Sequence, residues 1–381
     1  MKALSAVSAF RCLGAECADT CCQGWAMQIE PATEERYRKE APDLLESVTG
    51  PAGQRHMKRN PDTDFCVRYE GGLCGIQKQH GEAFLGDACF FYPRILRRAG
   101  EMPLMSASLS CPEIARLALR EGLLSYQDVP EPPRMPQEMR SYAEPDMDGA
   151  AMMALHEALV AWALARPAEE ALLDFALFAE HWERDRSAAF TRDTIMTLRS
   201  SAPKAEKLAV DAYRLAHCLS VLILASRRKA PPRLERIEQD ILEELKVGVN
   251  PETFMIENKA QDFSAAQKLE AGWRAHKEVM APVMSRWLAA QVSASFFPFG
   301  GLGAGAYERA VLLALKFAIF RLGLMAHAGK TSEANVDEAA RVAQGLSRFM
   351  DHLADPALSM ALYKDAGWTQ LSRLRGLLAS G

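Results

Sequence analysis

The chain has 381 residues, a formal net charge of -4 and 49% hydrophobic residues. A chain of this length can bury a sizeable core and is more typical of two folded units than of one. The slightly acidic charge argues against a nucleic-acid partner, because nucleic-acid-binding domains are usually strongly basic.

The N-terminal residues and the apolar stretches predict a soluble, cytoplasmic protein with no membrane partner. Residues 1–9 carry one lysine among mixed Ala, Ser and Val and run directly into Arg11, unlike a secretory signal. The most apolar stretch, 310–324, contains Lys316 and Arg321, so it lacks the roughly 18 to 20 uninterrupted apolar residues of a membrane span. Cytoplasmic thiols stay reduced, so a dense group of cysteines there more often binds metal than forms disulfides.

Residues 1–125 are rich in cysteine, glycine and aromatic residues and show little periodicity, which predicts an irregular, cysteine-rich metal-binding domain. Within them, residues 31–40 are expected to form a helix, with a proline in its first turn and acidic residues early. Ser110 and Glu113 have the spacing of a capping box that opens a second helix. Cys111 would lie in the first turn of this helix, where the helix dipole lowers the pKa of a thiol.

The rest of the chain predicts a mainly α fold. Four prolines lie within residues 129–136, so we expect 126–146 to be a Pro-rich linker. Residues 147–381 are expected to form an α-helical domain, because apolar residues recur there at three- and four-residue spacing. No run of alternating β-branched residues suggests a substantial sheet. The expected helical segments are 147–165, 168–199, 203–227, 233–247, 263–293, 306–326, 332–353 and 357–378.

Eight of the nine cysteines lie in the first 111 residues, and only Cys218 lies beyond them. Thiolates bind soft or borderline metals, chiefly zinc and iron–sulfur clusters. Eight thiols could hold two tetrahedral zinc ions, or one four-iron cluster with cysteines to spare. We expect a subset of the following to ligate a metal: Cys12, Cys17, Cys21, Cys22, Cys66, Cys74, Cys89 and Cys111.

The spacing of these cysteines matches none of the common metal motifs. The two Cys-x2-Cys knuckles of a structural zinc ribbon are absent, and so is the ferredoxin run of Cys-x2-Cys spacings. Cys17 and Cys21 supply the first two positions of the Cys-x3-Cys-x2-Cys motif of radical-generating iron–sulfur enzymes, but Gly24 occupies the third. The spacing therefore leaves zinc and iron–sulfur both open.

Blocks within residues 10–113 resemble the flagellin lysine-N-methylase family. Further along, Phe297-Pro298, the apolar helix after it and residues 348–352 agree loosely. The first block also resembles the broader zinc- or iron-chelating domain family with a Cys-x2-Cys-x2-Cys-Cys pattern, although the spacing here departs from that pattern. The specific blocks are Phe10-Arg-Cys12, Cys17-Ala-Asp-Thr-Cys21-Cys22-Gln-Gly24-Trp25, Gly72-Leu-Cys74-Gly-Ile, Cys89-Phe-Phe-Tyr-Pro-Arg94 and Ser110-Cys111-Pro112-Glu113.

This resemblance implies a bacterial protein-lysine N-methyltransferase that methylates flagellin lysines with S-adenosylmethionine and carries a cysteine-bound 4Fe-4S cluster. A sulfonium donor favours aromatic and acidic surroundings, because cations gain energy against π faces. Trp25, Tyr92 and Asp87 are therefore candidates for binding the donor, although each aromatic, taken singly, is better explained by packing a small metal-held core. The sequence assigns no catalytic residue, and the cluster's role is open between stapling this region and anchoring the donor.

Two later features are interpreted as structural. The glycines of residues 299–305 precede an apolar helix and superficially resemble a nucleotide-binding loop. Such a loop should follow a strand within a βαβ unit, whereas this one follows helix-like sequence, so a connection between helices is the better interpretation. Asp351 and His352 are interpreted as ordinary core or surface residues of a helix.

Two other functions stay open on the sequence. The chain could be a non-enzymatic zinc-binding adaptor whose helical domain docks a partner protein, in which case it would bind zinc and no methyl donor. It could instead be a redox or iron-handling protein that uses exposed thiolates, in which case its thiols would oxidise reversibly without loss of metal.

Overall fold

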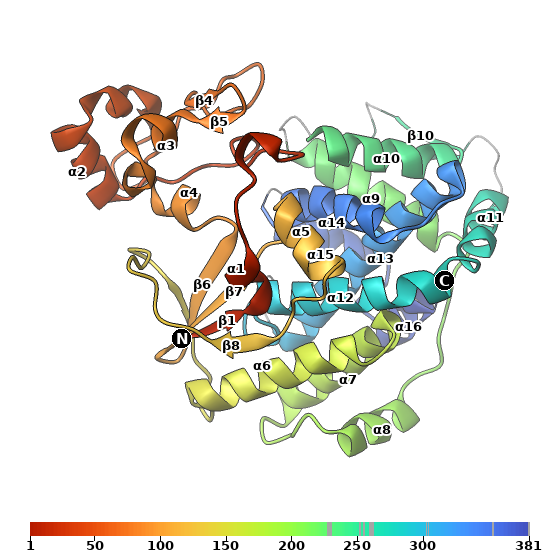
Figure 1. Ribbon diagram of the computed structural model, residues 1–381. Helices are drawn as coiled ribbons and strands as arrows, with labels where there is room; N and C mark the ends of the chain where they lie inside the picture. Colours follow the sequence, from red (N-terminus) through yellow and green to blue (C-terminus); the bar gives the residue numbers. More distant parts are fainter. Residues whose placement is uncertain are drawn as a thin grey trace.

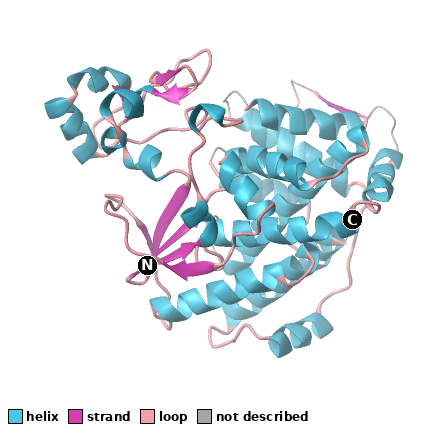
Figure 2. Ribbon diagram, in the orientation of Figure 1, coloured by secondary structure: helices cyan, strands magenta, loops and turns pink. Residues whose placement is uncertain are grey.

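The computed structural model is mostly helical, and its N-terminal third contributes a small mixed sheet (Figures 1 and 2). The mainly α prediction is thus confirmed, and no substantial sheet is present among the described residues after 147, as expected. The N-terminal region, which was expected to be irregular, contributes the small mixed sheet. The structure describes residues 1–226, 231–250, 253, 256–258, 263–301, 303, 305–352 and 354–379.

The sheet has five strands in the order β8-β1-β7-β6-β9. β6 and β7 form an antiparallel hairpin, and Gly100 in its turn has a positive φ of 54° that favours glycine. β1 lies parallel to β7 and antiparallel to β8, and β9 pairs with β6 in parallel. The strands are β1 (Lys2–Leu4), β6 (Arg94–Ala99), β7 (Met102–Ala107), β8 (Tyr126–Asp128) and β9 (Arg140–Tyr142).

The strands lack the alternating β-branched residues by which a strand is recognised in a sequence. β6 reads Arg-Ile-Leu-Arg-Arg-Ala and β7 reads Met-Pro-Leu-Met-Ser-Ala, with Ile95 as the one β-branched residue of the pair. The last four residues of β7 are all buried, so no alternation of apolar and polar positions appears. Strands covered on both faces read as short apolar runs, which periodicity cannot distinguish from buried helix.

The Pro-rich segment 126–146 contributes β8 and β9 to the two edges of the sheet as well as connecting it to the helices. One hydrophobic core runs from the strands and α5 (Pro112–Leu119) into the later helices. The boundaries at residues 125 and 146 stay a prediction.

The later helices lie largely within the predicted segments, but three of those segments each hold two helices. α7 ends at Arg184, and the Thr191 side chain caps α8. A positive φ of 79° at Gly367 separates α15 from α16. The bounds are α6 (Gly149–Leu164), α7 (Ala168–Arg184), α8 (Arg192–Ser201), α9 (Asp211–Ala225), α10 (Pro232–Glu244), α11 (Ser264–Trp273), α12 (Lys277–Ser295), α13 (Ala306–Thr331), α14 (Val336–Met350), α15 (Pro356–Asp365) and α16 (Leu371–Leu378), with the short strands β10 (Val247–Val249) and β11 (Ile256–Asn258) between α10 and α11.

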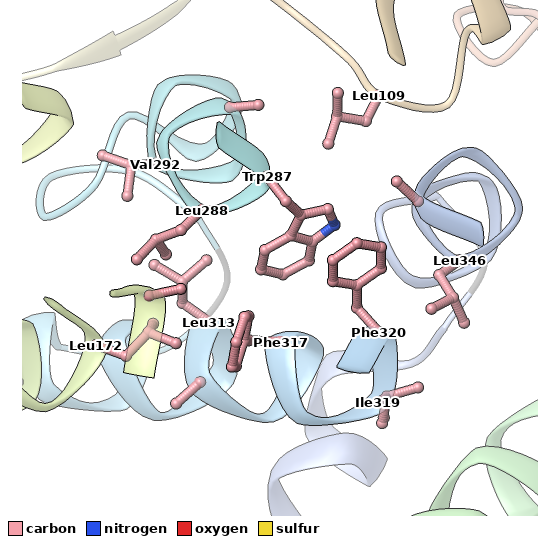
Figure 3. Close-up of a cluster of buried hydrophobic side chains, with 14 of the residues drawn as sticks. Leu109, Leu172, Trp287, Leu288, Val292, Leu313, Phe317, Ile319, Phe320 and Leu346 are labelled. Carbon is pink, nitrogen blue, oxygen red and sulfur yellow. The ribbon is translucent and has the colours of Figure 1, made fainter. Parts of the chain in front are cut away.

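The long helix α13 is the centre of the main core. Trp287 of α12 stacks on Phe320 with ring centroids 4.9 Å apart, and Phe317 packs beside them (Figure 3). By length and composition α13 could cross a membrane, but 89% of its most apolar window is buried inside the protein, as in a core helix. Lys316 and Arg321, which interrupt its apolar sequence, both have partners within the protein.

Residues 21–91 form a small lobe with its own core, seen at the upper left of Figure 1. A core of nine residues contributes little stability, so a lobe of this size usually needs a further staple. The core residues are Met27, Ile29, Tyr37, Ala41, Leu44, Met57, Cys66, Ile76 and Leu85. The elements are α2 (Pro31–Glu40), as predicted, then β2 (Val48–Thr49), β3 (His56–Met57), β4 (Tyr69–Glu70), β5 (Leu73–Cys74), α3 (Gly75–His80) and α4 (Asp87–Phe91), while α1 (Ser5–Ala9) precedes the lobe.

The stack on α13 gives a stability prediction. Replacing Phe320 by Ala should lower the free energy of unfolding by about 3–5 kcal/mol, because the buried area of the ring is lost and a cavity remains. Denaturation by urea measures this change. Val279→Ala is the control, since its side chain is 69% exposed and should change stability by less than about 0.5 kcal/mol. A similarly small effect at Phe320 would contradict the central place of α13 in the core.

Candidate functional site

The eight N-terminal thiols converge on Cys21, although they come from segments almost 100 residues apart. Cys22 hydrogen-bonds both Cys21 and Cys74. The thiols within electrostatic reach of Cys21 are Cys17, Cys22, Cys66, Cys74, Cys89 and Cys111, and Cys12 adjoins the group through Cys17. Cys218 lies apart from them, buried in α9. The structure therefore brings together the set that the sequence singled out.

Helix starts and backbone hydrogen bonds fix the positions of these thiols. Cys74 precedes the first residue of α3, and Cys111 stands in the same position before α5. Cys89 lies within the short helix α4. The backbone N–H of Cys66 donates to the carbonyl of Cys22 at 2.7 Å, which ties the Cys21-Cys22 pair to the small lobe.

The hydrogen bonds of Cys22 favour the thiolate form of two neighbouring cysteines. They lower the pKa of the Cys74 thiol to about 6, and they also lower the pKa of Cys21. The pKa of Cys22 itself is raised, because its proton is shared with those two sulfurs and because it is buried. Thiolates are the form that binds metal, so Cys21 and Cys74 are the thiols closest to a ligating state.

The expected effect of the helix start on Cys111 is wrong. Burial raises the pKa of this thiol to about 12, and hydrogen bonds from the backbone of Glu113 and Ile114 offset it only in part. The expected capping box is absent as well, since Cys111 takes the cap position and no side chain caps α5. Glu113 instead pairs with Arg116 at 2.7 Å. Desolvation outweighs the helix dipole here because the thiol is almost completely buried.

The donor set suits a soft metal by its chemistry, but it is not arranged around an ion position. Among the described residues, no group of three or more His, Cys, Asp or Glu side chains is placed so as to hold a metal ion. Sulfur donors in this number fit zinc or an iron–sulfur cluster better than a hard cation. Which of the eight cysteines ligate therefore stays a prediction.

An ion pair from the C-terminal half holds the cysteine loop. Arg348 of α14 donates to the carboxylate of Asp19 at 2.6 Å and to the carbonyl of Gln23 at 2.6 Å. Gln344, one turn earlier, donates to Asp19 at 2.8 Å and to the carbonyl of Ser110 at 3.0 Å. Burial favours a higher pKa for the Asp19 carboxyl, but Arg348 and the hydrogen bonds together lower it. Asp19 is therefore the ionised partner of a largely buried pair.

A narrow aromatic pocket opens beside Cys21, and we call it the aromatic pocket. Its rings are Trp25, Tyr92 and His352. The rest of the wall is formed by Cys21, Gln23, Gly24, Ser110 and Arg348. The Trp25 ring lies 5.8 Å from that of Tyr92 and 6.3 Å from that of His352, between centroids. Two of the three predicted donor-binding residues thus share one wall next to the thiols.

Asp87, the third predicted donor-binding residue, lies elsewhere. Its carboxylate pairs with Arg134 at 2.6 Å and accepts the backbone N–H of Gln137 at 2.7 Å. These bonds tie the Pro-rich segment to the small lobe, which is a structural role. Asp87 does not line the aromatic pocket.

His352 is a site residue that the sequence reading treated as ordinary. Its Nε2 lies 3.0 Å from the Ser110 hydroxyl, which is in turn 3.2 Å from the hydroxyl of Tyr92. Burial lowers the pKa of His352, so the ring is neutral near pH 7. The sequence signal for His352 was its place in residues 348–352, which loosely resemble the methylase family. The fold places these residues directly against the block at Ser110, where the resemblance is more specific.

Comparison with known proteins shows a distant, partial similarity to lysine methylases. The lysine-N-methylase of Salmonella typhimurium is 27% identical over 129 residues, which cover 30% of this chain and 31% of that protein; its counterpart from Salmonella choleraesuis gives the same figures. The flagellar biosynthetic protein FliU of Salmonella muenchen is 26% identical over 125 residues, covering 30% of this chain and 74% of the relative. The match thus spans under a third of the length of the methylases. No family model and no solved structure matches the chain.

The pair between Arg348 and Asp19 gives a second prediction. Arg348→Met should lower the free energy of unfolding by about 3 kcal/mol, because Asp19 is left buried without its counter-ion. Arg341→Met on the same helix is the control, since Arg341 is 63% exposed and pairs with Glu338 on the surface of the same helix. Its loss should cost less than about 1 kcal/mol by urea denaturation. Equal effects of the two substitutions would contradict a docking role for Arg348.

Proposed function

We propose that this protein is a cytoplasmic protein-lysine N-methyltransferase that methylates flagellin with S-adenosylmethionine and carries a cysteine-bound 4Fe-4S cluster. The observation that carries the proposal is the convergence of eight thiols on Cys21 beside the aromatic pocket. The partial similarity to lysine methylases supports it and suggests the methyltransferase class. The similarity to a flagellar protein supports flagellin as the substrate.

The residues of the aromatic pocket suit a sulfonium group. Trp25 and Tyr92 present π faces, which attract a cation most strongly where water is excluded. Burial raises the pKa of the Tyr92 phenol, so this ring stays neutral. The attacking lysine must also be neutral, and free lysine has a pKa near 10.4, so the reaction requires desolvation of the amine. The pocket at about 10 Å³ admits only a water, so its wall must move for a donor to enter.

The metal would be held by a subset of the eight cysteines, with Cys21 and Cys74 as the thiols closest to the thiolate form. Such a cluster would supply either a staple for the region or an iron able to bind the amino and carboxylate groups of the donor. The staple is supported by the small lobe, whose nine-residue core is too small to be stable without a further constraint.

Metal content is the first test. Anaerobically purified protein should contain about four irons and four labile sulfides per chain and should absorb visible light. Cys21→Ala should abolish the bound iron and sulfide and the visible absorption. Cys218→Ala, which changes a buried cysteine outside the group, should keep them. Stoichiometric zinc without visible absorption would overturn the cluster and favour the zinc-binding adaptor. Reversible thiol oxidation with no metal change would favour the redox protein.

Activity tests the donor site. Trp25→Leu should lower kcat/KM for methyl transfer to flagellin by about tenfold, because a cation–π contact of about 1–2 kcal/mol is lost. Mass spectrometry of flagellin lysines measures the transfer. The control is Phe65→Leu, a ring in the same lobe that stacks on Tyr69 at 4.8 Å and does not line the aromatic pocket. Unchanged kcat/KM in Trp25→Leu would place the donor elsewhere.

A further inference from the structure

A second and larger cavity lies on the other side of His352, and we call it the cationic cavity. Its volume is about 310 Å³. Strands β6 and β9 form one wall, and the ends of α12, α13, α14 and α15 form the others. His352 lines both cavities, so the two spaces adjoin at this side chain.

The cavity carries an excess of positive charge. Four basic side chains line it, Arg97, Arg140, Arg309 and Lys316, against the single carboxylate of Asp351. That carboxylate is already paired with Lys316 at 2.5 Å. Among the described residues no carboxylate lies within ion-pair distance of the three arginines. Arg140 is exposed to solvent and Arg309 is half-buried, so the uncompensated charge matters most at the buried Arg97.

Arg97 is the cation whose burial costs the most free energy. It is 9% exposed, and its guanidinium donates to the Ala294 carbonyl and, at 3.3 Å, to the Ser106 hydroxyl. These neutral acceptors, together with the Tyr142 hydroxyl, use part of its hydrogen-bonding capacity without balancing its charge. A buried cation without a counter-ion is destabilising, and an anion in the cavity would relieve this cost.

Two buried polar atoms of the wall have no partner in the described part of the chain. They are the Tyr363 hydroxyl, on a fully buried side chain, and the Nε of Arg309, whose Nη1 donates to the Pro298 carbonyl at 2.7 Å. Burial, and to a lesser degree the nearby Cys218 thiol, raise the pKa of Tyr363, so its hydroxyl stays protonated and can donate. Buried donors are rarely left unpaired, so both point to an acceptor that comes from outside the chain.

The glycine-rich segment forms part of the same wall. Gly300 and Gly301 line the cavity, while Leu302 and Ala304 lie outside the described residues. A Cβ on Gly300 would lie 2.5 Å from the Ser295 carbonyl and 2.9 Å from the Tyr142 ring, so a side chain here cannot fit. The segment is a connection between α12 and α13, as interpreted from the sequence, and it also shapes this cavity.

We propose that the cationic cavity binds a small organic anion, namely a carboxylate or phosphate group on an apolar body. Arg97, Arg309 and Tyr363 would hold the anionic group. Ile95, Leu312 and Leu313 supply apolar wall for the rest of the ligand. The excess positive charge disfavours the sulfonium donor, so this site is additional to the proposed methyltransferase activity and does not depend on it.

Isothermal titration calorimetry on the full chain tests this, with phenyl phosphate, phenylacetate and neutral benzyl alcohol as probes. One of the two anions should bind at least about tenfold more tightly than benzyl alcohol, and the preferred anion identifies the group. Tyr363→Phe removes an unpaired hydroxyl, so folding should be retained while anion affinity falls about fivefold. Arg309→Gln should weaken binding by about tenfold or more, whereas exposed Arg192→Gln should leave it unchanged.

Three results would overturn the proposal. The first is that neither anion binds more tightly than benzyl alcohol. The second is that affinity is the same in Tyr363→Phe and Arg309→Gln as in the unmodified protein. The third is S-adenosylmethionine binding that is lost in both variants, which would make this cavity the donor site and leave the methyltransferase proposal standing. Failure of methyl transfer with anion binding intact would instead remove the proposed function alone.

Discussion

The contact between Asp19 and Arg348 determines how the two halves of this protein work together. Asp19 stands between Cys17 and Cys21, so the ion pair fixes the most crowded part of the thiol group against α14. Arg348 and His352 are four residues apart, and the same docking places the histidine against Ser110 and Tyr92. The aromatic pocket therefore has no complete wall until residues more than 300 positions apart have met. The shape of the site rests on this buried pair, which also adds to the stability that the shared hydrophobic core provides.

The sequence predicts the elements that depend on local order, and it fails for those that depend on distant partners. The helices after residue 147 follow from apolar periodicity, but the periodicity missed the turns that divide three of the segments, such as the one at Gly367. The sheet could not be foreseen, because β1 gains its partners only from β7 and β8, about 100 residues later. In the site, the cysteines are visible in the sequence. The burial that raises the pKa of Cys111, and the approach of His352 to Ser110, exist only after folding.

The two cavities that share His352 differ in what lines them. The aromatic pocket presents the π faces of Trp25 and Tyr92, and the guanidinium of Arg348 in its wall is paired with Asp19. The cationic cavity is lined by three arginines that have no carboxylate within ion-pair distance among the described residues. A neutral imidazole belongs to the walls of both.

The chain enters and leaves the small lobe at a single point. Phe10 precedes the lobe and Arg94 follows it, and the Arg94 guanidinium lies 5.2 Å from the centre of the Phe10 ring. Both residues belong to elements next to the main core, so the lobe is an excursion between neighbouring positions of one host fold. Segments whose ends nearly meet are those that host folds accept or lose most readily. A lobe with this geometry could be exchanged for another, in evolution or by protein engineering, without changing the topology of the rest of the chain.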